Sequence, residues 1–271
     1  FNDLEMFNFL TVKNNVENST AEIISKKYKK LPDLLTRLKS LTVFDISETT
    51  DMPLSEVFIK TQKFDINCEN KAGNSLLFLA VKQGNLDRIK WLTDFPSIDL
   101  NKKNNSTRWT ALHIAARTAS LNIIEHLLSF SGLQVNSPDT NGSTPLHFAV
   151  RSGNLPCFKV LTTYPGINVN CKTKDNVTPF LLAVRYGLLD IIRNLYLNWR
   201  ISVNQVTNSE KTTALHIAVA HNHADVVKFL LSIPNININA TDNKGNTPLK
   251  LATNFQYNSM IEMLSTKTSN E

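Results

Sequence analysis

The stretch Thr144-Pro145-Leu146-His147-Phe148-Ala149 recurs along the chain and organises most of it. Two close copies begin at Thr110 and Thr213, and three weaker copies complete the set. Successive copies lie 34 or 35 residues apart, as shown by the alanine that closes each one: Ala80, Ala115, Ala149, Ala183, Ala218 and Ala252. Six copies at so constant a spacing predict a repeat architecture in place of a single globular core.

Each copy is embedded in the same local pattern. A turn such as Asp139–Gly142 comes first, and a threonine then precedes a helix that has proline at its first position. After a glycine turn such as Gly153, a second segment places apolar residues at helical spacing, for example Ile123, Ile124 and Leu127. A β-branched segment ending in asparagine closes the unit. The pattern predicts two short helices per repeat.

This unit resembles the ankyrin repeat, whose core is T-P-L-H-x-A. The resemblance covers residues 69–265. It implies an all-α solenoid of stacked helix-turn-helix units with projecting β-hairpin loops, which binds proteins through the hairpin tips and a concave face. It also implies that the T-P-L-H histidines form hydrogen bonds between adjacent hairpins: His113, His147 and His216. The fourth copy departs from the family pattern, because Leu181 stands in the histidine position.

The predicted organisation has four parts. Residues 1–39 show helical spacing outside the repeat and form a helical N-terminal extension. Residues 40–68 form a degenerate ankyrin-like unit, residues 69–265 form six repeats, and residues 266–271 form a frayed tail. A solenoid needs such terminal units, because an exposed end of the stack must be covered by polar surface.

Composition narrows the functional classes. The 271 residues are 42% hydrophobic and 19% charged, which is typical of a chain that buries a core. No apolar run is long enough to cross a bilayer, the chain start lacks the pattern of a signal peptide, and the three cysteines are scattered. We therefore expect a cytoplasmic protein without a disulfide framework, and no membrane insertion. The net charge of +6 lies in residues 64–271. This positive charge is too sparse for a nucleic-acid interface.

Two groups of residues could carry chemistry. His221-Asn222-His223 could chelate zinc, but no further ligand stands at a suitable spacing, and His223 begins the second helix of its repeat. Cys157 and His147 could form a nucleophilic pair, although a buried core thiol is the simpler interpretation of Cys157. We expect no catalytic residues, no cofactor and no metal.

A row of basic residues suggests where a partner binds. In four successive repeats, the residue five positions after the T-P-L-H leucine (or its equivalent) in the first helix is basic: Lys82, Arg117, Arg151 and Arg185. Packed helices would place these residues about 10 Å apart. The row predicts a partner with an acidic or phosphorylated segment, because each arginine can bind a carboxylate through two hydrogen bonds. The alternative is that these arginines are solvated residues that cover neighbouring alanines.

Neighbouring positions add polar and aromatic side chains to the predicted surface. Tyr186 and His221 follow the basic position, and Asn74 and Trp109 precede the helix caps. Tryptophan, tyrosine and arginine are the most frequent hot-spot residues of interfaces. Trp109 is therefore predicted to contact the partner, or else to fold over its own loop.

The predicted function is a non-catalytic adaptor or scaffold that binds a protein partner. The alternative is a targeting or regulatory region of a larger protein: a bacterial effector acting in the host cytosol, a ubiquitin-ligase substrate adaptor or a channel. Leu31-Pro32-Asp33-Leu34-Leu35 faintly resembles the opening of an F-box, which motivates the ubiquitin-ligase possibility. Oligomeric state and partner identity are not encoded in these patterns.

Overall fold

The computed structural model describes residues 65–268, which contain twelve helices. The chain divides into two units between Lys102 and Lys103, so the described residues of the first unit are 65–102 and those of the second are 103–268. The extension predicted at 1–39 and most of the degenerate unit predicted at 40–68 lie outside the described residues. None of the described helices has the length and apolar character that crossing a membrane requires.

The first unit contains one described helix pair, α6 (Leu76–Gln83) and α7 (Leu86–Thr93). Ser75 begins α6 because its hydroxyl accepts the N–H of Phe78 at 3.2 Å, and Asn85 caps α7 in the same way by accepting from Arg88 at 2.9 Å. Gly84 ends α6 in a left-handed conformation, with φ of 71°. The caps that the sequence pattern predicts are therefore present.

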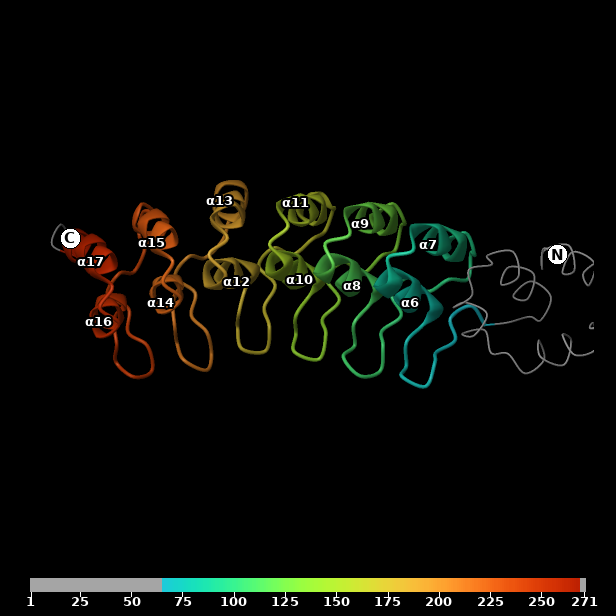
Figure 1. Cartoon of the computed structure of the whole chain (residues 1–271), viewed down its shortest axis with the longest axis horizontal. Coiled ribbons are helices and arrows are strands. Elements are labelled where there is room, and N and C mark those ends of the chain that lie inside the picture. Colours follow the sequence, from blue (N-terminus) through green and yellow to red (C-terminus); the bar gives the residue numbers. More distant parts are fainter. Residues whose placement is uncertain (1–64, 269–271) are drawn as a thin grey trace, which may run out of the picture. The chain divides into compact units, whose positions relative to one another are not determined.

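The second unit contains five helix pairs (Figure 1). The first helices of the pairs are α8 (Ala111–Arg117), α10 (Pro145–Ser152), α12 (Pro179–Arg185), α14 (Ala214–Ala220) and α16 (Pro248–Asn254). The second helices are α9 (Leu121–Leu128), α11 (Leu155–Thr163), α13 (Leu189–Asn198), α15 (Ala224–Leu231) and α17 (Asn258–Thr268). Each first helix packs against the next first helix, so α8 to α16 form one row and the hairpin loops project from it. This arrangement confirms the predicted solenoid.

The recurring residues explain why the pairs stack. The alanine that closes each T-P-L-H copy is at most 1% exposed in all six copies, because the neighbouring helix leaves no room for a larger side chain. Large apolar residues such as Phe158, Leu161 and Ile192 fill the layer between the two rows. The burial of apolar surface stabilises the stack by about 25 cal/mol for each Å² removed from water.

The turn after each first helix has a fixed left-handed residue. Glycine supplies it at Gly153 and Gly187, as predicted. Three repeats use other residues at the equivalent position, namely Ala119, Asn222 and Gln256, with φ between 52° and 58°. Left-handed conformations are costly for residues with a Cβ other than asparagine, so the turns at Ala119 and Gln256 carry strain that glycine would avoid.

The hairpin loops are tight turns without regular strands. In the described residues, the single β-bridge joins Glu69 to Ser75. In the second unit a backbone bond closes each hairpin, for example from the Asp139 N–H to the Ser143 carbonyl at 2.8 Å. Adjacent hairpins are also joined, as where the Lys174 N–H donates to the Asn141 carbonyl at 2.9 Å. The hairpins therefore form a continuous edge along the second unit.

The last helix continues beyond the predicted end of the repeats at 265, because α17 has 11 residues and ends at Thr268. The Thr266 hydroxyl donates to the carbonyl of Glu262 at 3.0 Å, so the polar side chain binds the helix backbone instead of ending it.

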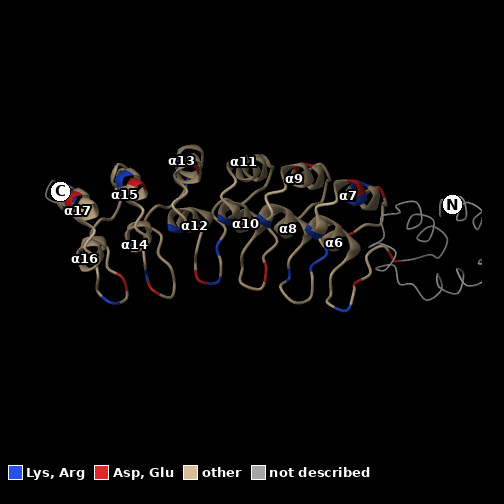
Figure 2. Ribbon diagram, viewed as in Figure 1, with Lys and Arg blue, Asp and Glu red and all other residues tan. Residues whose placement is uncertain are grey.

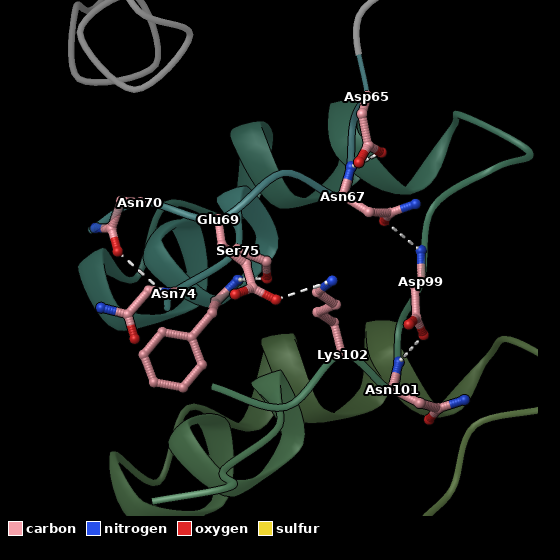
Figure 3. A network of polar contacts seen from close by, with 10 residues as sticks. Asp65, Asn67, Glu69, Asn70, Asn74, Ser75, Asp99, Asn101 and Lys102 are labelled. Atoms are coloured by element: carbon pink, nitrogen blue, oxygen red, sulfur yellow. Dashed lines mark hydrogen bonds and ion pairs between the residues drawn. The ribbon is translucent and has the colours of Figure 1, made fainter. Parts of the chain in front are cut away.

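Four of the asparagines that close a repeat act as clamps to the next repeat: Asn67, Asn136, Asn170 and Asn204. In the first unit the Asn67 amide accepts the Asp99 N–H at 2.7 Å (Figure 3), and it donates to the Ser97 carbonyl at 2.7 Å. The second unit repeats this pattern, with Asn136 donating to Gly166 at 2.8 Å and Asn204 donating to Asn235 at 2.7 Å. Each clamp joins the end of one repeat to the turn that closes the next.

Candidate functional site

The T-P-L-H histidines have the structural role that the resemblance implies. Nδ1 of His113 accepts the Thr110 N–H at 3.0 Å, and Nε2 donates to the Ser143 carbonyl of the next hairpin at 3.2 Å. His147 and His216 make the same bond to the following hairpin, at 3.1 and 2.9 Å. Burial lowers the pKa of His113 to about 4, so the ring is neutral at pH 7. These histidines fix the hairpins that surround the candidate site.

The three predicted arginines lie on the first helices of three successive repeats. Arg117, Arg151 and Arg185 occupy the last turns of α8, α10 and α12 and are exposed. Figure 2 shows the corresponding basic positions on these helices. Among the described residues, no carboxylate forms an ion pair with any of the three. The first-unit residue of the predicted row, Lys82, is exposed in the last turn of α6.

Trp109 packs against its neighbours and is half-buried. Its Nε1–H donates to Oδ2 of Asp139 at 3.2 Å, and its ring meets the Phe148 ring edge-on at 4.9 Å. The Arg117 guanidinium lies over the indole, 5.1 Å from the ring centroid. The alternative prediction, in which Trp109 folds over its own loop, therefore describes part of the geometry. Trp109 contacts the next repeat as well.

Trp109, Arg117 and Arg151 line one hollow of about 400 Å³, together with Asp139, Ser143 and Phe148. We call it the Trp109 hollow. Asp139 is buried, and its carboxylate accepts the N–H groups of Asn141 and Ser143 besides the indole N–H. Its negative charge is therefore compensated inside the hairpin. The two arginines remain available to an anionic group.

Arg185 and His221 line a second hollow of about 380 Å³, together with Asp175, Glu210, Asp242 and Phe255. We call it the Glu210 hollow. Burial, Arg185 and His223 lower the pKa of His221, so His221 adds no positive charge at neutral pH. Phe255 is 48% exposed and stacks on Tyr257. Phe255 lines this hollow, although it is not among the predicted contact residues.

The other predicted contact residues lie apart from these hollows. Tyr186 is 42% exposed at the end of α12 and belongs to the lining of neither hollow. Asn74 is half-buried in the first unit, where its N–H donates to Oδ1 of Asn70 at 3.0 Å (Figure 3). Its backbone is thus used in closing a hairpin.

The histidines and cysteines suspected of chemistry have structural surroundings. His223 donates from Nε2 to the Arg185 carbonyl at 3.0 Å and so caps α12. The sulfur beside His147 belongs to Cys171, 3.6 Å from Nδ1, and not to Cys157 as the sequence suggested. Burial raises the pKa of Cys171 to about 11, so its thiol is protonated at pH 7. Residues 65–268 contain no group of three or more metal-ligating side chains placed to hold an ion.

The family model for ankyrin repeats matches residues 48–139, 131–207 and 180–270. The chain belongs to the ankyrin-repeat family. Among solved structures, the ankyrin-repeat domain of Bcl-3, described as a unique member of the IkappaB family, aligns with a TM-score of 0.64 and 24% identity. That alignment covers 73% of this chain and 87% of the Bcl-3 domain, and it shows the shared fold. Ankyrin repeats are protein–protein interaction modules, and this is the general role of the chain.

Two curated proteins share shorter segments. Zinc finger CCCH domain-containing protein 56 of Arabidopsis thaliana is 31% identical over 104 residues, which are 32% of this chain and 15% of that protein. The mitochondrial liver isoform of glutaminase from Rattus norvegicus is 40% identical over 55 residues, 20% of this chain and 9% of that protein. The chain thus spans a small part of both relatives.

Proposed function

We propose that the chain is a non-catalytic adaptor or scaffold that binds an acidic or phosphorylated segment of a protein partner along the concave face. The observation that supports this most is the pairing of Arg117 and Arg151 in the Trp109 hollow. Both arginines are exposed, and neither forms an ion pair with a carboxylate of the described residues. A carboxylate or phosphate that entered the hollow would gain bonds to both guanidinium groups.

Trp109 gives the proposed site its rigidity. The indole is held by Asp139 and Phe148, and Arg117 in turn rests on the indole. Because the Arg117 side chain is already ordered, less conformational entropy is lost when an anion binds. Arg185 extends the row to the next helix and would contact the segment beyond the hollow.

Affinity purification with the whole chain, followed by mass spectrometry, tests this function. The wild type should recover a partner that Arg117→Glu with Arg151→Glu fails to recover. The matched control is Lys159→Glu with Lys228→Glu, which changes the net charge equally at exposed positions of α11 and α15. Loss of the partner in both double variants would show that net charge alone is responsible, and retention in both would contradict the proposed site.

A regulatory or targeting region within a larger protein is the second candidate function. Both curated relatives are much longer than the segment they share with this chain. In that case the repeats would hold a partner for an activity located elsewhere, as in a ubiquitin-ligase substrate adaptor, a channel or a bacterial effector. We also propose a cytoplasmic location, which agrees with the free state of Cys68, Cys157 and Cys171.

A further inference from the structure

The second helices of the second unit lie in a row on the side away from the hairpin tips, and three of them end in the same way (Figure 1). In α9, α11 and α15, the residue five positions after two consecutive buried apolar residues carries a hydroxyl: Ser129, Thr163 and Ser232. Each hydroxyl donates to the backbone carbonyl three residues earlier, at 2.6, 2.9 and 2.6 Å. This position therefore closes the helix in three repeats.

The helix α13 has Leu197 at the same position. Leu197 follows the buried pair Ile191 and Ile192 by the same interval. Its side chain is 74% exposed, more than any other large apolar side chain that the structure describes. Leucine cannot cap the helix, and at this exposure it does not fill the core. Neither role that the repeat offers at this position explains Leu197.

Aromatic and basic side chains surround Leu197. Arg193 is its neighbour one turn earlier on α13, and the Arg193 guanidinium lies over the Phe229 ring of α15, 5.8 Å from the centroid. Tyr196 meets the same ring edge-on at 5.9 Å, and both rings are half-buried. We call Arg193, Tyr196, Leu197 and Phe229 the α13 patch. The patch joins two adjacent repeats, and tyrosine and arginine are frequent hot-spot residues of interfaces.

The surroundings of the patch are positively charged. Residues 191–209 include Arg193 and Arg200 but no aspartate or glutamate. Both arginines are exposed, and neither forms an ion pair with a carboxylate within residues 65–268. Asp190 lies in the first turn of α13, about 10 Å along the helix axis from Leu197. On α15 one acidic and one basic residue balance each other. A partner of this patch should therefore carry negative charge.

We propose that the α13 patch is a second docking surface, which binds an amphipathic segment of a protein partner. The segment places a large apolar side chain over Leu197 and carboxylates beside Arg193 and Arg200. The apolar side chain removes the leucine and the two rings from water, and the arginines form charge-assisted hydrogen bonds to the carboxylates.

A second copy of this chain fits the α13 patch less well. A two-fold dimer through the patch would bring the same surface of both copies together, so the arginines of the two copies would repel each other. The patch also differs from the Trp109 hollow, which lies among the first helices and their hairpins. It can therefore bind a segment whether or not the hollow does.

A designed peptide tests the proposal with the full chain. The peptide is an amphipathic helix with a pair of leucines about four residues apart and glutamates on either side. One reference peptide has glutamines in place of the leucines, and the other has lysines in place of the glutamates. Every measurement uses the chain with Arg117→Glu and Arg151→Glu, so that the Trp109 hollow cannot bind the glutamates. Fluorescence anisotropy should show that the acidic peptide binds at least about tenfold more tightly than either reference peptide.

Leu197→Ser assigns the binding to the patch. Serine is the residue of α9 and α15 at this position, where it caps the helix, so the urea midpoint should not fall. Binding of the acidic peptide should weaken by about five- to tenfold, because one leucine side chain is no longer buried. The control Val206→Ser removes another exposed apolar side chain, in the hairpin before α14, and should preserve the affinity. Arg193→Glu with Arg200→Glu should abolish the preference for glutamates over lysines.

The outcomes separate this inference from the proposed function. No binding of the acidic peptide, or binding that survives Leu197→Ser, would overturn the docking surface and leave the arginine site of the Trp109 hollow intact. Equal binding of the acidic peptide and its lysine counterpart would overturn the acidic partner. Sedimentation velocity examines the remaining occupant: a dimer that Leu197→Ser dissociates would show that a second copy covers the patch, and this would also overturn the proposal.

Discussion

The guanidinium of Arg117 lies over the indole ring of Trp109, 5.1 Å from its centroid. This contact joins the residue before the cap of α8 to the last residue of the same helix. Because Trp109 also donates to Asp139 and meets Phe148, the contact connects a proposed binding residue to the packing of the next repeat. The stability of the hairpin and the proposed partner binding therefore depend on the same side chain.

Trp109→Ala should lower the free energy of unfolding by about 2 kcal/mol, because the aromatic contact, the cation–π contact and one hydrogen bond are lost. Trp109→Phe keeps an aromatic ring but lacks the Nε1–H, so its stability should be intermediate. Urea unfolding followed by circular dichroism measures both variants. An unchanged midpoint in Trp109→Ala would show that the indole does not support the hairpin.

The chain should lose stability as the pH falls from about 6.5 to about 4. The folded pKa of His113 is about 4, lowered from 6.5 by burial, so the unfolded chain binds a proton in this range that the folded chain does not. The free energy of unfolding therefore decreases with falling pH, by up to about 3 kcal/mol for this residue.

His113→Leu is the matched variant for this pH dependence, because Leu181 occupies the same position in another repeat. Its free energy of unfolding at pH 7 should be lower, since the Ser143 carbonyl loses its donor. Its further loss between pH 7 and pH 4.5 should be smaller than in the wild type. Identical slopes for the two proteins would contradict the assignment to His113.

Ala119→Gly should stabilise the second unit by about 0.5 kcal/mol. Ala119 has φ of 52°, where a Cβ costs about 1–2 kcal/mol, while glycine loses about 0.5–1 kcal/mol of backbone entropy. Ala115→Gly is the control, because Ala115 lies inside α8 and is fully buried; it should destabilise. A lower urea midpoint for Ala119→Gly would show that the turn is not strained.

Gly187→Ala should be more destabilising than Gly153→Ala. Both glycines have positive φ, but a Cβ at Gly187 would lie 2.7 Å from Nδ1 of His223, whereas at Gly153 its nearest neighbour is Leu188 at 3.4 Å. The difference should be about 1 kcal/mol or more, the cost of forcing a packed side chain to move. Adding His223→Ala to Gly187→Ala should reduce the penalty, and no reduction would argue against the clash.

The sequence predicts the helix pairs and their caps, because these features depend on residues close together in each repeat. The histidine bonds join hairpins 30 residues apart and follow from the resemblance to the ankyrin repeat. Thr144, Pro145 and His147 determine the start of α10 by themselves. The binding surface depends on contacts across about 30 residues, which spacing alone does not specify. Asp139 and Phe148 turn Trp109 into a packed residue, and Cys171 instead of Cys157 lies beside His147. Phe255 follows α16 as Tyr186 follows α12, and this shared position is the sequence signal that points to it.

The most direct test of the arginine site is the affinity for the partner segment, measured by titration calorimetry with the wild type, Arg117→Glu with Arg151→Glu, and the control Lys159→Glu with Lys228→Glu. The arginine variant should bind at least about tenfold more weakly, equivalent to about 1.4 kcal/mol, while the control binds like the wild type. Equal affinity of the wild type and the arginine variant would contradict the account.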